Sequence, residues 1–284
     1  MHYVYRTIDV AAHEATAEDL GRLLTSARRL GFNGLNITHP LKQLALPIMD
    51  ALSPSAARVG AVNTVLFEAD RMIGFNTDVT GFSSAFDAEF PGTEQGTVVL
   101  VGAGGGGAAV ATALASGRVK DLVILDADQR RAESLAAALP AGSARAGGLN
   151  ALPDLLSHAA GVVNATPCGM AAHPGPAFDP ALLRTRTWVA DIVYRPAETE
   201  LLAAARRKGC RVLPGLGMAM GQAADAFEIF TGEPADRAAM LADLFELAAA
   251  EMPPVQETGS NQTCSSGERT ATMPGNSTHE RKTQ

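Results

Sequence analysis

The sequence lacks the features that mark several classes of protein. Its three cysteines are widely spaced, which fits a reducing compartment and gives neither a disulfide framework nor a zinc pattern. Its 30 acidic residues outnumber 23 basic ones, so no basic surface is expected for a nucleic acid. The longest apolar run, residues 108–115, is too short to cross a bilayer, and the N-terminus has no signal-peptide core. We therefore expect a cytoplasmic protein without a metal, a nucleic-acid partner or a membrane contact.

What the sequence has is a sufficient supply of apolar residues, 46% of 284, for two modest domains. Strand and helix patterns alternate, which predicts the α/β class: an α/β domain over residues 1–92 and a doubly wound parallel sheet of the Rossmann type over 93–215. Residues 253–284 contain no leucine, isoleucine or aromatic residue and are predicted to be disordered. The predicted strands are 3–9, 34–37, 62–67, 72–75, 97–101, 122–125, 162–163, 188–193 and 211–213, and the predicted helices include 17–30, 77–90 and 129–139.

Lys42 lies just after a short apolar strand, at the end of the segment 36–42. Pro40 ends the strand and a new turn begins at Leu41, so Lys42 is expected at a strand-to-helix corner. Such corners often carry the reacting groups of α/β enzymes, and we take Lys42 as the candidate catalytic residue. The alternative is an ordinary solvated lysine in the first turn of a helix.

A glycine-rich turn joins the predicted strand 97–101 to an alanine-rich helix, which is the arrangement of a dinucleotide site. Gly102 is expected to permit the tight turn, and Gly104 to let the backbone approach a pyrophosphate. Gly107 is expected to let the helix pack close to the strand. The alternative is that the glycines merely form a flexible turn.

Asp126 follows the next predicted strand, nineteen residues beyond Gly107. A carboxylate at this position accepts hydrogen bonds from the ribose hydroxyls of the adenosine and repels a 2′-phosphate, so NAD is favoured over NADP. Arg130 and Arg131 leave NADP open, because a nearby guanidinium could accept the extra phosphate.

Six motifs, in order along the chain, resemble the shikimate/quinate dehydrogenase family. They are residues 36–42, 60–64 (GAVNT), 76–78 (NTD), the glycine turn, 164–170 (NATPCGM) and 215–222. His39 and Asp126 are similar to the branch of the family that uses NAD with quinate or shikimate. The resemblance implies that residues 216–252 return to the first domain, and that this domain binds a polyhydroxy carboxylate substrate.

The resemblance also implies a role for each matching residue. Lys42 and Asp78 would form the catalytic pair, with Thr38, Asn63, Asp78 and Gln222 as hydrogen-bond partners of the substrate. A lysine can take the hydroxyl proton if part of it is neutral; burial lowers its pKa and Asp78 raises it, so a base and a positioning group both stay open. The residues expected at the cofactor are Gly102, Ala103, Gly104, Gly105, Gly107, Asp126, Arg131, Thr166, Met170, Ile192, Tyr194 and Gly215.

The sequence departs from the family at its start, because Met1 stands at what would be the second strand. The strand before it carries two hydroxyl residues that hold the substrate carboxylate in the family. Without that strand, the parallel sheet of the first domain would lack an internal member. We expect either a start site placed too late or a truncated and impaired protein.

The leading hypothesis is an NAD-dependent oxidation of quinate or shikimate to the 3-dehydro acid, by a monomer or a homodimer. Two alternatives stay open: the biosynthetic reduction of 3-dehydroshikimate with NADPH, and a catalytically silent dinucleotide-binding protein. Comparing the two cofactors in one assay separates the first two, and replacing Lys42 separates both from the third.

Overall fold

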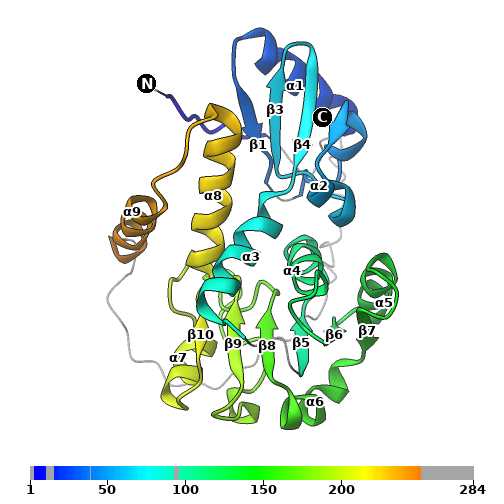
Figure 1. Ribbon diagram of the computed structural model, residues 1–284, viewed down its shortest axis with the longest axis vertical. Helices are drawn as coiled ribbons and strands as arrows, with labels where there is room; N and C mark the ends of the chain where they lie inside the picture. The colour runs from blue at the N-terminus through cyan, green and yellow to red at the C-terminus, as the bar shows by residue number, and fades with distance from the viewer. Residues whose placement is uncertain (1–2, 11–15, 39, 93–95, 251–284) are drawn as a thin grey trace, which may run out of the picture.

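The computed structural model describes residues 3–10, 16–38, 40–92 and 96–250. Two sheets lie one above the other in Figure 1, and the helices α3 (Thr77–Glu89) and α8 (Gly215–Thr231) run between them. This α/β architecture with two sheets confirms the predicted fold class. The predicted disordered tail 253–284 and His39 lie outside the described residues.

The upper sheet in Figure 1 has four strands in the order β1-β3-β4-β2. Strand β3 is antiparallel to both β1 and β4, whereas β2 is parallel to β4. The expectation of a parallel sheet here is wrong, because the tight turn Ala69-Asp70 joins β3 to β4 and can only reverse the chain. The strands are β1 (Gly34–Asn36), β2 (Ala51–Leu52), β3 (Thr64–Glu68) and β4 (Arg71–Phe75).

Helix α1 (Ala17–Arg29) packs against this sheet and begins at a capping box. Thr16 Oγ1 accepts a hydrogen bond from Asp19 N at 3.2 Å, and Asp19 Oδ2 accepts one from Thr16 N at 3.0 Å. Its buried Leu20 and Leu24 share a core cluster with the strand residue Val65. The shorter elements around this cluster are η1 (Leu46–Ile48) and α2 (Pro54–Val59).

The predicted strand 3–9 is wrong: residues 3–10 pair with no strand in the described part of the chain. Side chains hold this segment instead. The Tyr5 hydroxyl donates to Asn36 Oδ1 at 3.0 Å, and the Tyr3 ring meets Phe227 edge to face, with centroids 5.9 Å apart. The apolar residues fit a strand pattern, but a strand forms only where a neighbouring backbone completes its hydrogen bonds.

The lower sheet in Figure 1 has six parallel strands in the order β10-β9-β8-β5-β6-β7. This is the doubly wound order that the sequence predicted, with the chain starting in the middle and running outward in both directions. The strands are β5 (Thr97–Val101), β6 (Asp121–Leu125), β7 (Ala144–Gly147), β8 (Gly161–Asn164), β9 (Trp188–Asp191) and β10 (Val212–Leu213). The elements between them are α4 (Gly105–Ala115), α5 (Gln129–Ala138), η2 (Leu149–Ala151), α6 (Leu152–His158), η3 (Pro180–Leu182) and α7 (Glu200–Arg207).

Helix α3 belongs to the core of the lower sheet although it follows the upper one in the chain. Its Phe86 and Phe90 rings lie 5.2 and 4.8 Å, centroid to centroid, from the ring of Trp188 in β9. The same helix packs closely against α8, and α9 (Arg237–Ala250) packs on the other side of α8. The first turn of α3 is thereby fixed with respect to both sheets.

Candidate active site

Lys42 and Asp78 lie together although 36 residues separate them in the sequence. Lys42 Nζ donates a hydrogen bond to Asp78 Oδ2 at 2.6 Å, and the two side chains are 27% and 12% exposed. Lys42 lies in the turn between β1 and the short 3-10 helix η1, so the predicted corner leads into η1 and not into an α-helix at Leu41. Pro47 has no N–H to donate to Gln43 O, so the turn around Lys42 does not continue into η1 as one α-helix.

The start of α3 orients Asp78. Asn76 caps the helix: its Oδ1 accepts from Val79 N at 3.4 Å, and its Nδ2 donates to Ala61 O at 3.0 Å. Asp78 therefore lies in the first turn, where the helix dipole stabilises a carboxylate. Sequence reasoning missed this role of Asn76, although an asparagine directly before a predicted helix is a common capping signal.

Asn63 is buried, 3% exposed, and is held by protein partners in this structure. Its Oδ1 accepts from Thr77 N at 2.8 Å and from the Thr64 hydroxyl at 3.0 Å, while its Nδ2 donates to Thr77 Oγ1 at 3.1 Å. The amide thus ties the end of the upper sheet to the residue next to Asp78. Its role as a hydrogen-bond partner of the substrate stays a prediction.

Thr38 and Gln222 lie on different segments of the structure. Thr38 is exposed at the end of the segment after β1, and its carbonyl accepts from Leu41 N at 3.0 Å. Gln222 is half-buried on α8, with Nε2 donating to Ala219 O at 3.1 Å. A Cβ added to Gly81 of α3 would lie 2.5 Å from Gln222 N, so the two helix backbones touch one turn beyond Asp78.

The glycine turn between β5 and α4 has the predicted strand, turn and helix geometry. Gly102 has a φ of +106°, and a Cβ on Gly107 would lie 2.1 Å from Gly102 O, so both positions require glycine. A Cβ on Gly104 or Gly105 would meet no atom within 4 Å, so the start of α4 is open to a ligand. Backbone N–H groups at such a helix start fit a pyrophosphate.

Asp126 lies beside this turn, at the end of β6. Its Oδ2 accepts from Ala103 N at 2.7 Å and its Oδ1 from Asp128 N at 2.9 Å. Arg130, on the first turn of α5, is 3.4 Å from Asp128 Oδ1 through Nε, and Arg131 is exposed on the same helix. The structure therefore brings Asp126 and Ala103 into contact, whereas the Arg131 side chain is exposed to solvent on α5.

The remaining predicted cofactor residues lie on the loops after β8 and β9. Met170 and Tyr194 are 43% and 46% exposed, and Thr166 Oγ1 donates to Asn164 Oδ1 at 2.7 Å. A Cβ on Gly106 of the glycine turn would lie 2.5 Å from Ile192 Cδ1, which places Ile192 against α4.

Gly215 starts α8 next to these loops, where a Cβ would lie 2.5 Å from Val193 O. Sequence reasoning missed Asp191, which ends β9 and is 2% exposed. Burial raises the pKa of Asp191 to about 6, against the hydrogen bonds from Thr199, Val193 N and Asn164, which lower it. An acidic residue at the end of a buried apolar strand was the signal that could have found it.

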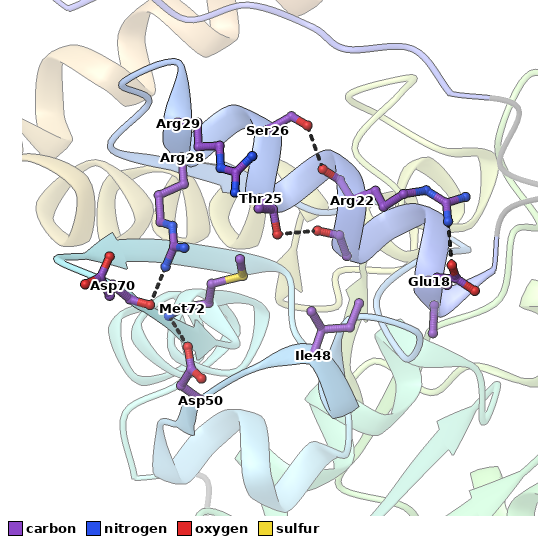
Figure 2. Close-up of a pocket in the computed structure, with 12 residues that line it drawn as sticks. Glu18, Arg22, Thr25, Ser26, Arg28, Arg29, Ile48, Asp50, Asp70 and Met72 are labelled. Carbon is purple, nitrogen blue, oxygen red and sulfur yellow. Dashed lines mark hydrogen bonds and ion pairs between the residues drawn. The ribbon is translucent and has the colours of Figure 1, made fainter.

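A separate cavity of about 680 Å³ lies between α1 and the ends of η1 and β4, and Figure 2 shows its lining. Some of its charged groups already have protein partners: Arg22 Nη1 lies 2.6 Å from Glu18 Oε1, and Asp50 Oδ2 accepts from Met72 N at 2.7 Å. None of the predicted site residues lines this cavity. We therefore take the Lys42–Asp78 pair, and not this cavity, as the site of chemistry.

No group of three or more histidine, cysteine, aspartate or glutamate side chains among the described residues is arranged to hold a metal ion. Within the same part of the chain, no helix is both long and apolar enough to cross a membrane.

Comparison with known proteins matches three family models to this chain. The shikimate dehydrogenase substrate binding domain matches residues 1–65, the shikimate/quinate 5-dehydrogenase model residues 85–172, and the shikimate 5'-dehydrogenase C-terminal domain residues 215–244. A shikimate dehydrogenase (NADP(+)) of Pseudarthrobacter chlorophenolicus is 52% identical over 255 residues, 88% of this chain and 87% of that protein. The chain belongs to the shikimate/quinate dehydrogenase family. This member of the family is an oxidoreductase with a site for a nicotinamide dinucleotide.

Relatives of this shikimate/quinate dehydrogenase carry both cofactor names. A quinate/shikimate dehydrogenase (NAD(+)) of Corynebacterium efficiens is 48% identical over 249 residues, 86% of this chain and 88% of that protein. The solved quinate dehydrogenase from Corynebacterium glutamicum in complex with NAD superposes with a TM-score of 0.77 at 46% identity, over 81% of this chain and 83% of that one.

Proposed function

We propose that this dehydrogenase oxidises the ring alcohol of quinate or shikimate to the 3-dehydro acid, with NAD as the hydride acceptor. The observation that carries the proposal is the Lys42–Asp78 pair, Nζ to Oδ2 2.6 Å, at the start of a helix that packs into the core of the dinucleotide-type sheet. The Lys42 amino group and the Asp78 carboxyl group, partly shielded from solvent and in contact, form a proton-handling pair.

The side chains of the site divide the work of the reaction. A nicotinamide dinucleotide held at the glycine turn would supply the acceptor for the hydride of the alcohol carbon. Lys42, in its neutral form, takes the alcohol proton, and Asp78 holds the lysine in place and stabilises the ammonium that results. Thr38 and Gln222 bind further hydroxyl groups, and Asn63 exchanges its bond to Thr77 Oγ1 for one to the substrate.

The contacts of Asp126 favour NAD over NADP. Its carboxylate is fixed beside the glycine turn by two backbone donors, where it would accept hydrogen bonds from ribose hydroxyls and repel a 2′-phosphate. Arg130 is paired with Asp128, which leaves Arg131 as the cation that would accept a phosphate. NADPH-dependent reduction remains the second candidate, because Arg131 is exposed there and the Pseudarthrobacter relative is named for NADP(+).

A silent dinucleotide-binding protein is not favoured. The Lys42–Asp78 pair is assembled, and the relatives that match 86–88% of the chain are named dehydrogenases.

One steady-state experiment tests the proposed function. The purified chain is assayed with quinate and with shikimate, each with NAD and with NADP, and the reduced cofactor is followed by its absorbance. We expect the NAD reactions to have the higher kcat/KM. Turnover with NADP but not with NAD would support the second candidate, NADPH-dependent reduction, in place of the first. No turnover in any of the four combinations would refute both candidates.

A further inference from the structure

The carboxylate of Asp191 is the most deeply buried charged group among the described residues, and the proton-handling pair does not use it. It lies at the end of β9 and is 2% exposed. Its three hydrogen-bond donors are uncharged: Asn164 Nδ2 at 3.0 Å, Val193 N at 3.0 Å and the Thr199 hydroxyl at 2.7 Å. Burying a carboxylate in this way costs stability, and a functional role for Asp191 would explain why the charge is buried.

Each donor belongs to a different segment. Asn164 ends β8, and its side chain also organises the loop that follows: Oδ1 accepts from Thr166 N at 3.0 Å, and Nδ2 donates to Cys168 O at 3.1 Å. Thr199 caps α7, with its Oγ1 accepting from Leu202 N at 3.3 Å. One carboxylate therefore joins the loop after β8, the loop after β9 and the start of α7.

The loop after β8 also packs directly on this carboxylate. Gly169 has a φ of +103°, and a Cβ added there would lie 4.0 Å from Asp191 Oδ2 and 3.1 Å from Thr199 Cγ2. Asn164 and Thr199 are as buried as Asp191, 0% and 1% exposed, so no solvent competes for these bonds. The two loops have little freedom while the three side chains stay in contact.

We propose that Asp191 is the positioning residue that sets the nicotinamide end of the cofactor site, by holding the loops after β8 and β9 in register. These loops present Thr166, Met170, Ile192 and Tyr194, and the inference rests on the proposed role of these four residues at the cofactor. A small displacement of either loop would change how a bound nicotinamide faces the substrate, and misplacement by about 1 Å can cost on the order of a hundredfold in rate.

The test compares three substitutions with a matched control. Asp191→Ala removes the acceptor for all three donors, whereas Asp191→Asn keeps one acceptor oxygen and can place its amide against Thr199 Oγ1. Thr199→Val removes the bond from its hydroxyl to Asp191 Oδ2, together with the cap bond that the hydroxyl accepts from Leu202 N. Asp179→Ala, the control, removes an exposed carboxylate that accepts from Ala181 N at 2.8 Å at the start of η3, beyond Thr166 and Met170 in the chain and without a bond to Asp191.

Cofactor affinity is measured by calorimetry without substrate, with whichever of NAD or NADP the parent chain binds, and kcat and KM are measured separately. We expect Asp191→Ala to weaken cofactor binding by about tenfold or more, because three buried donors lose their acceptor, and to lower kcat. Asp191→Asn should stay within about threefold of the parent, and Asp179→Ala should match it.

A folded Asp191→Ala protein with parental affinity and kcat would overturn the inference, and so would an Asp191→Asn protein as impaired as the alanine variant. If Asp191→Ala does not fold, Thr199→Val decides: affinity weakened by about threefold supports the inference, and parental affinity overturns it. A parent chain that binds no dinucleotide refutes the proposed function itself, which is a different result.

Discussion

Gly81 and Gly221 bring α3 and α8 into backbone contact: a Cβ on Gly221 would lie 2.8 Å from Gly81 Cα. The contact lies one turn beyond Asp78 on one helix and next to Gln222 on the other. Because neither glycine has a side chain, the two helices approach closely. This approach sets the distance between Asp78 and Gln222, which are proposed to act on the proton and on the substrate.

Gly81→Ala should disturb both stability and activity. The new methyl would lie 2.5 Å from Gln222 N and 2.8 Å from Met218 O, and because both are backbone atoms the helices must move apart. We expect the free energy of unfolding to fall by about 1–3 kcal/mol, measured by urea denaturation. We also expect kcat/KM to fall by roughly tenfold or more, because Gln222 and Asp78 are displaced.

Gly21→Ala is the matched control for that substitution. It also lies in a helix, but its Cβ would lie 3.7 Å from Ile48 Cγ2, an ordinary contact. It should be neutral or stabilise by up to about 1 kcal/mol. Equal losses in the two variants would show that the close contact between α3 and α8 does not matter.

Lys42→Ala should abolish most turnover while leaving cofactor binding intact. Removal of the proton acceptor is expected to lower kcat by about 10²–10⁴. The dissociation constant of the dinucleotide, measured by calorimetry, should not change, because Lys42 contacts Asp78 and not the glycine turn. Lys120→Ala, at an exposed position before β6, is the control. A parental kcat for Lys42→Ala would remove this lysine from the mechanism.

Asp126→Asn should shift the cofactor preference towards NADP. The amide removes the charge that repels a 2′-phosphate and keeps one oxygen for Ala103 N or Asp128 N. We expect the ratio of the two dissociation constants to move by roughly tenfold or more in favour of NADP. Asp121→Asn, at the other end of β6, should leave the ratio unchanged. If the ratio does not move in either variant, Asp126 does not select the cofactor.

Asp191 should make the stability of the protein depend on pH. Burial raises its pKa from 3.8 to about 6, so the folded state keeps a proton that the unfolded state has already lost. This contribution is fully present below about pH 4 and is lost as the pH rises through about 6, with a total of about 3 kcal/mol. Asp191→Asn has no proton to lose. Its free energy of unfolding relative to the parent should therefore rise by about 2 kcal/mol between about pH 4.5 and 7.5, in urea titrations. A difference that is constant with pH would contradict the assignment.

Local sequence signals predicted the elements that local interactions form. The strand Thr97–Val101 was predicted with the bounds that the structure shows, because a continuous β-branched run before a glycine turn has few alternatives. The start of α1 was predicted at residue 17, directly after the Thr16 cap that the structure shows. The strand Ala144–Gly147 was not predicted, because alanine and glycine give no hydrophobic alternation and only pairing with β6 makes this segment a strand.

Contacts between distant residues could not be predicted from pattern. The approach of Lys42 to Asp78 was expected only from the family resemblance, since nothing near either residue specifies a partner 36 positions away. The Asn164–Asp191 bond joins residues 27 positions apart on neighbouring strands, and its existence depends on the strand order. Periodicity identified both strands but not which side chains meet at their ends.

Helix α3 has a consequence for how the protein can be recombined. Its first turn carries Asp78, while Phe86 and Phe90 fill the space beside Trp188 in the other sheet. A chimera that joins the upper sheet of this protein to the six-stranded sheet of a relative would inherit a helix shaped for the wrong neighbour. The end of α3 that carries these aromatic residues therefore has to come from the same protein as β9. A hybrid whose crossover lies between Asp78 and Phe86 meets this condition, and it should keep the Asp78 carboxylate in place better than a crossover after α3.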